Sequence, residues 1–577
     1  MQTCTPFGFL LLLILSVALL YGQFLWSPLV FDDLPFFMVD SAGNQPVSNY
    51  YFSLFELRSF PYASLAWTKS WFGLELIYFR MGNLLLHAAV VLALFFFLAK
   101  LLATTNPLPD VEGLSPRFTA FCIALIFALH PVAVYAAAYL VQRTILMATL
   151  FGLLAMLAYL HGSLQNRALW LWLSVPLYYL AVLCKEHAIM LPAALLALTI
   201  LLHHDWRIKL WQRKGIFTTL AIIAVFAVAA KQGLLGSVYE VNAQEMLSAE
   251  SDRGDVQSVM AVTSGEDSSY LMSILTQSWL FFKYIALWLL PNPNWLSVDM
   301  REPFAKSLSS PYLAALVSFI AWGVVGCWLL IKRGRIGLLG WAMLFPWLMF
   351  MTEFSVIRIQ ESFVLYRSYL WGIGVCVGLA VLLDMLRKRL LVVVVAAVLV
   401  ILFPISMGRL QTFSHPLLLW DDAEKLVKDR LYLPGVNRIY YNRGNQLLKV
   451  KKLDLAIGDF KQAITLQPDW PYPYHNLGSA YLQAGQWQEA VEAFTQAIKV
   501  GQASKFGLNS KGYLGRAQAW ESMNEVGKAK LDYQKSCSLI LQGCDKLLRL
   551  FIAAYLCHLV AESFHAALSI RFQSSKA

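Results

Sequence analysis

Residues 444–463 are GNQLLKVKKLDLAIGDFKQA, and residues 478–497 are GSAYLQAGQWQEAVEAFTQA. The two stretches begin 34 residues apart and carry the same small or aromatic residue at four equivalent positions, which are Gly444 and Gly478, Ala456 and Ala490, Phe460 and Phe494, and Ala463 and Ala497. Glycine and alanine let paired helices approach closely, so this period predicts stacked helical hairpins. A more divergent third copy contains Gly515, Ala517, Ala529 and Tyr533.

This pattern is typical of tetratricopeptide repeats. We predict repeats at about residues 437–470, 471–504 and 508–541, in a domain that covers residues 409–577. The amphipathic segment 547–570 is predicted to cap the array, because the end of a solenoid must cover its last apolar face. Cys537 and Cys544 permit a disulfide in an oxidising compartment without requiring one.

Residues 1–408 have the sequence of a polytopic membrane domain. The whole chain of 577 residues is 58% hydrophobic and 14% charged, whereas soluble domains have about 25% charged residues. Eleven apolar runs are predicted to span a membrane, although several are shorter than the ~20 residues that cross a bilayer without adjustment. They are 7–24, 83–102, 118–134, 145–160, 168–183, 188–202, 216–230, 312–331, 336–351, 363–383 and 390–406. The predicted fold class is all-α, a transmembrane helix bundle followed by an α-solenoid.

Basic residues in short loops set the predicted orientation. The loops 207–214, 332–335 and 387–389 are expected in the cytoplasm. The N-terminus is then cytoplasmic, and the first loop (25–82), an acidic loop (235–270) that we expect to cover the site as a lid, and the repeats lie outside. Met272–Leu290 would break this rule if it crossed, so we predict that it lies in the interface or re-enters.

The charge balance and the loops also bear on partners and location. These basic loops account for the net charge of +11, and no basic run interleaved with aromatic residues predicts nucleic-acid binding. The short loops favour a bacterial inner membrane, which would place the repeats in the periplasm. A homologue in the endoplasmic reticulum would have a similar sequence, so that location stays open.

The pair Asp32-Asp33, just after the first span, is the sharpest local signal for chemistry. Adjacent carboxylates beside apolar residues are costly unless they are paired or used. One of them can be a general base whose pKa is raised by its neighbour. The alternative interpretation is an ordinary solvated turn, in which aspartate is common.

Further ionisable residues lie at the ends of the spans on the same predicted side. Their convergence on Asp32-Asp33 predicts a site for a phosphate-bearing substrate, because Lys and Arg bind phosphate. Ion pairs that only orient helices are the alternative. The set is His130, Gln142, Arg143, Lys185, Glu186, His187, Arg358, Glu361, Tyr366 and Arg367, with Arg58, Arg80, Asn83 and His87 as further polar residues among apolar neighbours.

Several of these residues form short motifs in a fixed order along the chain. The motifs are Phe31-Asp32-Asp33, Arg58–Trp67 with Asn83–His87, His130-Pro131 with Tyr139–Arg143, Cys184–His187 and Leu365–Leu370. With the repeats, this order resembles the C-superfamily (GT-C) integral-membrane glycosyltransferases, and most closely the transmembrane and tetratricopeptide-repeat O-mannosyltransferases and their bacterial relatives. The resemblance spans nearly the whole chain, and its specificity lies in the order of the motifs.

The resemblance implies transfer of a sugar from a polyprenyl-phosphate-linked donor to Ser or Thr hydroxyls of extracytoplasmic proteins. We expect an inverting mechanism with one displacement. The resemblance also implies that Asp32 is the catalytic base with Asp33 in support, and that Arg143, Lys185 and Arg367 bind the donor phosphate. The implied supporting residues are Arg58, His87, His130, Glu186, His187 and Tyr366. Where the family pattern has a Glu after His-Pro, this chain has Tyr135. A divalent metal bridge would therefore lack its second carboxylate. We predict no metal ligands, and the sequence identifies no cofactor, although a divalent metal stays open.

The repeats are expected to dock the acceptor protein, because such arrays present a concave surface. The membrane lipids are further expected partners. Two other functions stay open. One is a glycosyltransferase with a lipid or polysaccharide acceptor, and the other is a non-enzymatic tetratricopeptide scaffold for envelope assembly. A transporter would be favoured by repeated transmembrane halves, which we do not find in the sequence.

Overall fold

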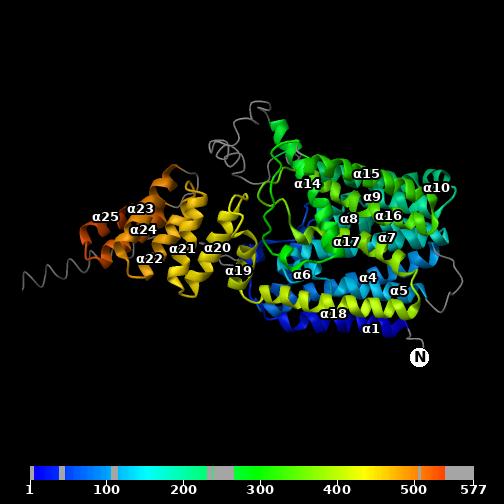
Figure 1. The fold of residues 1–577 in the computed structure, drawn as a ribbon, viewed down its shortest axis with the longest axis horizontal. Coiled ribbons are helices and arrows are strands. Elements are labelled where there is room, and N and C mark those ends of the chain that lie inside the picture. Colours follow the sequence, from blue (N-terminus) through cyan, green and yellow to red (C-terminus); the bar gives the residue numbers. More distant parts are fainter. Residues whose placement is uncertain are drawn as a thin grey trace, which may run out of the picture. The chain divides into compact units, whose positions relative to one another are not determined.

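The computed structural model describes residues 6–37, 46–105, 115–230, 237, 266–308, 310–503 and 509–539. It divides the chain into two units, Met1–Leu426 and Val427–Ala577. Figure 1 shows that both units consist of helices, and the one β-bridge among the described residues joins Met300 to Phe363.

The boundary between the units lies later than the predicted position after residue 408. The reason is that α18 (Lys388–Phe413) is followed by α19 (Pro416–Val427), which buries Leu419 in the core of the first unit.

Seven helical segments of the described first unit are long and apolar enough to cross a membrane. Two bent pairs raise this number to nine if each pair is one span. The seven are Phe7–Phe24 (α1, Pro6–Tyr21, with η1, Gly22–Phe24), α4 (Leu76–Thr105), Leu140–Gln165 (η4, Leu140–Gln142, with α7, Arg143–Gln165), α15 (Ser310–Lys332), Gly334–Ser355 (α16, Gly334–Phe350, with η7, Met351–Ser355), Leu365–Leu383 (η8, Leu365–Arg367, with α17, Ser368–Leu383) and α18. The bent pairs are α5 (Pro116–Ala128) with α6 (Pro131–Ala137), and α10 (Trp206–Gln212) with α11 (Lys214–Ala229).

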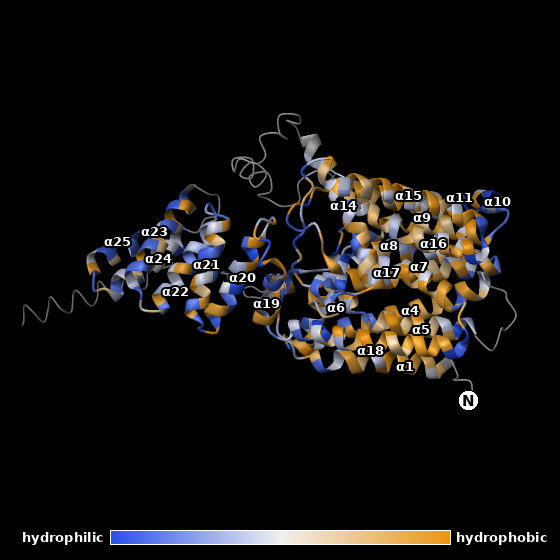
Figure 2. Cartoon of the chain, in the orientation of Figure 1, coloured by the Kyte–Doolittle hydropathy of each residue, from blue (hydrophilic) through white to orange (hydrophobic). Residues whose placement is uncertain are grey.

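The eleven predicted apolar runs all fall on helices, but they are not eleven uniform spans. Two of them lie on shorter apolar helices, α8 (Ala168–Cys184) and Glu186–Leu202 (η5, Glu186–Met190, with α9, Leu191–Leu202). One bend follows from Pro131, which begins α6 at a turn of 65° because a proline lacks the N–H that a continuous helix needs. Figure 2 shows that hydrophobic residues predominate on these helices, whereas polar and hydrophobic residues are mixed on the second unit. Helix α14 (Glu266–Leu289) contains most of the run predicted to re-enter, and it is not among the candidate spans.

The three basic loops predicted to share one side of the membrane do gather at one end of the first unit. Arg213 donates to the Ser163 hydroxyl at the C-terminal end of α7 (2.9 Å). Arg333 donates to the backbone oxygen of His204 (3.1 Å), and Arg335 pairs with Asp384 at the end of α17 (2.8 Å). Residues at the N-terminal end of α7 therefore lie at the opposite end of the unit, about 30 Å away at 1.5 Å per residue.

The second unit contains three helical hairpins in its described part. They are α20 (Val436–Lys449) with α21 (Leu453–Leu466), α22 (Pro471–Gln483) with α23 (Trp487–Ala503), and α24 (Asn509–Ser522) with α25 (Val526–Leu539). The repeated glycines are required by packing, since a Cβ on Gly444 would lie 2.8 Å from the ring of Phe460, and a Cβ on Gly478 2.9 Å from that of Phe494.

Several features expected of the sequence fall on segments that the structure does not describe. Cys537 is disulfide-bonded, but its predicted partner Cys544 lies outside the described residues. The capping segment 547–570 and most of the acidic loop, residues 238–265, lie outside them as well.

Candidate functional site

A cavity of about 470 Å³ lies in the first unit, at the end where α7 begins. Its wall draws on segments far apart in the sequence, including η2 (Phe31–Asp33), α3 (Ser59–Phe72), η5, η7 and η8. Seven of the eleven predicted site residues line it, namely Asp32, Arg58, Lys185, Glu186, His187, Tyr366 and Arg367. The structure therefore brings these seven residues together around one cavity, while the role of each residue stays a prediction.

The two adjacent aspartates face different surroundings. Phe31 has a left-handed backbone (φ 47°), a conformation that is costly for a bulky residue and is often found at functional sites. The turn exposes Asp32 to the cavity and fully buries Asp33, whose Oδ1 accepts a hydrogen bond from the backbone N–H of Val141 (3.0 Å). Burial raises the pKa of Asp33 to about 7, although the Arg80 guanidinium opposes the shift. Asp32 is thus the carboxylate that a ligand in the cavity would meet.

Arg58 and Glu186 form an ion pair on the cavity wall, with Arg58 Nε 3.1 Å from Glu186 Oε2. The nearby carboxylate raises the pKa of Arg58, so the guanidinium stays charged. Arg58 itself has a left-handed backbone (φ 65°), and its N–H donates to the oxygen of Leu183 (2.7 Å). The pair joins the segment before α3 to η5.

Lys185 extends along the cavity wall, and its Nζ donates to the side-chain oxygens of Gln142 (3.1 Å) and Thr144 (3.4 Å). The ammonium also lies 4.6 Å from the ring centroid of Tyr366. Burial, reinforced by the positive charge of Arg58, holds the pKa of Lys185 well below its usual value. An anion bound beside Lys185 would reverse this effect, because a neighbouring negative charge favours the protonated amine.

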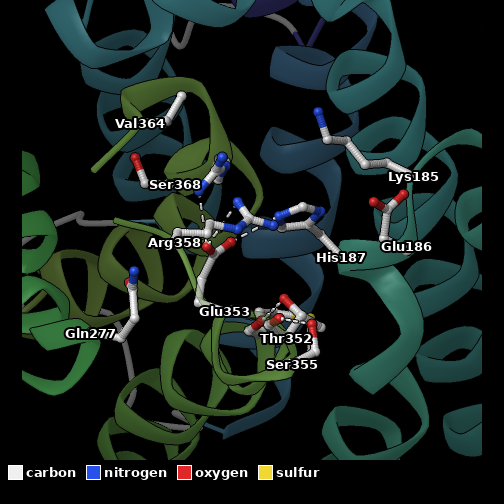
Figure 3. Close-up of polar contacts among 12 residues, drawn as sticks. Lys185, Glu186, His187, Gln277, Thr352, Glu353, Ser355, Arg358, Val364 and Ser368 are labelled. Atoms are coloured by element: carbon white, nitrogen blue, oxygen red, sulfur yellow. Dashed lines mark hydrogen bonds and ion pairs between the residues drawn. The ribbon is translucent and has the colours of Figure 1, made fainter. Parts of the chain in front are cut away.

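A buried carboxylate that the sequence analysis did not single out holds the basic residues together. Glu353 accepts hydrogen bonds from Nε2 of His187 (2.9 Å) and from Arg367 (3.1 Å), and it pairs with Arg358 (3.4 Å). Figure 3 shows Glu353 between His187 and Arg358, with Lys185 and Glu186 nearby. The available signal was a lone acidic residue at the end of an apolar run, a feature that is functional by default.

Arg143, predicted to bind the donor phosphate, does not line the cavity. Its buried guanidinium donates to the side-chain oxygen of Asn83 (2.9 Å) and to the backbone oxygens of Phe79 (2.8 Å) and Ser64 (3.1 Å). These contacts join α7 to α3 and α4, and they commit all three guanidinium nitrogens to protein acceptors. Among the described residues, Arg358 lines the cavity instead.

His87 and His130 are also buried away from the cavity lining. His87 Nδ1 lies 2.6 Å from the Tyr369 hydroxyl, and its Nε2 lies 3.2 Å from the backbone oxygen of Ala128. The ring of His130 stacks on Trp288 with centroids 4.5 Å apart. Such contacts hold helices together, and neither histidine reaches the residues that converge on Asp32.

The cavity combines the solvent-facing carboxylate of Asp32 with the basic side chains of Lys185, Arg358 and Arg367. Arg58, a fourth basic residue of the lining, is paired with Glu186. This set suits a ligand that carries both an anionic group and a proton that Asp32 can accept. Within the described ranges, no cluster of three or more His, Cys, Asp or Glu side chains has the arrangement to hold a metal ion. Tyr135, which stands where the resembling family has a Glu, is buried.

Comparisons with known proteins concern the repeats. Residues 435–503 match the Tetratricopeptide repeat family. Small glutamine-rich tetratricopeptide repeat-containing protein 2 of Mycosarcoma maydis is 36% identical over 63 residues, which cover 11% of this chain and 18% of that protein. The chain thus spans less than a fifth of this curated relative.

Three solved structures are also similar. The first TPR of Spaghetti (RPAP3) bound to an HSP90 peptide is 21% identical, covers 21% of this chain and 93% of its own, and has a TM-score of 0.19. MamA is 19% identical, with coverages of 30% and 97% and a TM-score of 0.23. The APC/C hetero-tetramer Cut9-Hcn1 is 12% identical, with coverages of 95% and 96% and a TM-score of 0.21. The family match confirms that the chain contains tetratricopeptide repeats, a module for protein interaction.

Proposed function

We propose that this chain is a membrane glycosyltransferase of the GT-C type, which moves a sugar from a polyprenyl-phosphate-linked donor to Ser or Thr hydroxyls of extracytoplasmic proteins. The observation that carries the proposal is the cavity, where Asp32 meets Lys185, Arg358 and Arg367 although these residues come from separate parts of the chain. A donor with a phosphate and an acceptor with a hydroxyl would use both kinds of group.

The proposed reaction is a single displacement with inversion. Asp32 takes the proton from the acceptor hydroxyl while that oxygen forms a bond to the anomeric carbon of the sugar. The bond from this carbon to the lipid phosphate breaks through an oxocarbenium-like transition state. The phosphate leaves as an anion, so no general acid is needed, and Lys185, Arg358 and Arg367 stabilise its growing negative charge.

The proposal includes a membrane location and a role for the repeats. The candidate spans would lie in a bacterial inner membrane with the basic loops in the cytoplasm. The cavity, at the opposite end of the unit from those loops, would then open on the periplasmic side, where the repeats would hold the acceptor protein. A scaffold without enzymatic activity is the second candidate, and the repeats favour it because they are a protein-binding module.

Mass spectrometry of envelope glycopeptides tests the proposal in cells that lack the protein. Wild type should restore a hexose-type mass on Ser or Thr, whereas Asp32→Asn should restore almost none while still binding the donor. Asp205→Asn, at an exposed aspartate of the basic end, is the matched control and should restore the mass fully. Restoration by Asp32→Asn would remove Asp32 as the base, and no change on any protein would redirect the search to lipid acceptors and then to the scaffold.

A further inference from the structure

His187 lines the cavity with one of its two ring nitrogens uncommitted. Its side chain is only 5% exposed, and Nε2 is held by Glu353 at 2.9 Å. Nδ1 is buried and has no hydrogen-bond partner among the described residues. Buried polar atoms in native proteins nearly always have a partner, so an unpartnered one on a cavity wall indicates a place for a ligand group.

Glu353 decides which nitrogen carries the ring proton. The carboxylate pairs with Arg358 and Arg367, and an ionised carboxylate can only accept hydrogen bonds. His187 must therefore donate from Nε2, and its neutral ring then has a lone pair on Nδ1. A second proton on Nδ1 would bury a further positive charge beside these arginines, which is costly. Nδ1 is thus an uncommitted hydrogen-bond acceptor on a residue that lines a cavity rich in cationic donors.

We propose that His187 is a specificity-determining residue, whose Nδ1 accepts a hydrogen bond from a hydroxyl of the donor sugar. This inference rests on the proposed function and deepens it. A fully ionised phosphate has no proton to donate, whereas every sugar presents hydroxyl donors. The cations Lys185, Arg358 and Arg367 would hold the phosphate, and the sugar attached to it would supply the hydroxyl to Nδ1 of His187, which lines the same cavity. Sites built around such a hydrogen bond discriminate strongly against ligands that lack the hydroxyl.

Two substitutions distinguish a role of His187 in recognising a sugar hydroxyl from a role in holding Glu353. His187→Gln can still donate an amide N–H to Glu353, but it places no acceptor at the position of Nδ1. His187→Asn places its oxygen near the position of Nδ1, but it is too short to donate to Glu353. The dissociation constants would be measured for the purified full-length chain in detergent. The probes are bare undecaprenyl phosphate and the same lipid phosphate carrying mannose, glucose or N-acetylglucosamine.

Wild type should prefer one sugar-bearing lipid over the bare lipid phosphate. His187→Gln should lose about tenfold of this preference, the effect of one neutral hydrogen bond to a buried group, and His187→Asn should lose less. Elution of each variant as a single monodisperse species, with the helical signal of wild type, shows that it folds.

Two results overturn the inference in different ways. If His187→Gln keeps the preference at least as well as His187→Asn, His187 only positions Glu353. If wild type prefers none of the sugar-bearing lipids, the proposed donor class fails instead, and the inference fails with it.

Discussion

Glu353 offers the most direct test of how the cavity is built. We predict that Glu353→Gln destabilises the first unit severely, although the change is nearly isosteric. The substitution removes one negative charge, while the guanidiniums of Arg358 and Arg367, 3.4 and 3.1 Å away, remain. It also removes the ionised acceptor of His187. Two positive charges would then share a buried site without the carboxylate of Glu353.

The magnitude follows from burial. The Glu353 side chain is 1% exposed, and those of Arg358 and Arg367 are 10% and 5% exposed. Removing one partner of a buried ion pair costs about 3–5 kcal/mol, because the remaining charge stays desolvated and uncompensated. The net contribution of the intact cluster is smaller than this, since its formation also required desolvation of every member.

The assay is equilibrium unfolding of the purified full-length protein in mixed micelles, followed by a spectroscopic signal from the helices. Glu75→Gln, at an exposed glutamate before α4, is the control and should change the unfolding free energy by less than about 0.5 kcal/mol. The double variant Glu353→Gln with Arg367→Gln should cost less than the sum of the single variants, because it removes both opposite charges. A loss for Glu353→Gln as small as that of the control, or strict additivity in the double variant, would refute the reasoning.

Two further predictions concern the buried aspartate and the repeats. Because burial raises the pKa of Asp33 from 3.8 to about 7, the folded state binds this proton more tightly than the unfolded state, and stability should fall as the pH rises from about 4 to about 7. Above pH 7 the free energy of unfolding should be lower than at acidic pH by at most about 4 kcal/mol. Asp33→Asn should abolish this pH dependence. The prediction is contradicted if wild type loses no more stability than the variant between pH 5 and pH 8. In the repeats, Gly478→Ala should destabilise by about 1–3 kcal/mol, because its Cβ would meet Phe494 at 2.9 Å. Gly458→Ala, where a Cβ meets nothing within 4 Å, should leave the thermal midpoint unchanged or raise it, and equal shifts for the two variants would exclude the packing argument.

The apolar runs and the 34-residue period were readable from the sequence because each depends on local pattern. A run such as Leu390–Ser406 has few ways to satisfy its backbone other than a helix. The period identified Gly444 and Gly478 as positions where paired helices approach closely, and the structure adds that each glycine packs against the ring of a phenylalanine. The boundary between the units was harder to predict from the sequence, because α19 joins the first unit only through the packing of Leu419 in the hydrophobic core of that unit.

For the candidate site too, some features could be predicted from the sequence and others are decided only by tertiary packing. The sequence by itself determined which residues were costly to bury, and Asp32, Lys185 and Arg367 do line one cavity. Without the family resemblance, the residues alone could not distinguish Asp32 from Asp33, or show that Arg143 is committed to Asn83, because a single turn or a helix contact decides where each side chain points. Glu353 was overlooked because its importance lies in three partners from other segments. Charge and period are properties of the chain, whereas the pairing of buried charges is decided only when helices pack, since desolvation makes each ion depend on neighbours that are distant in sequence.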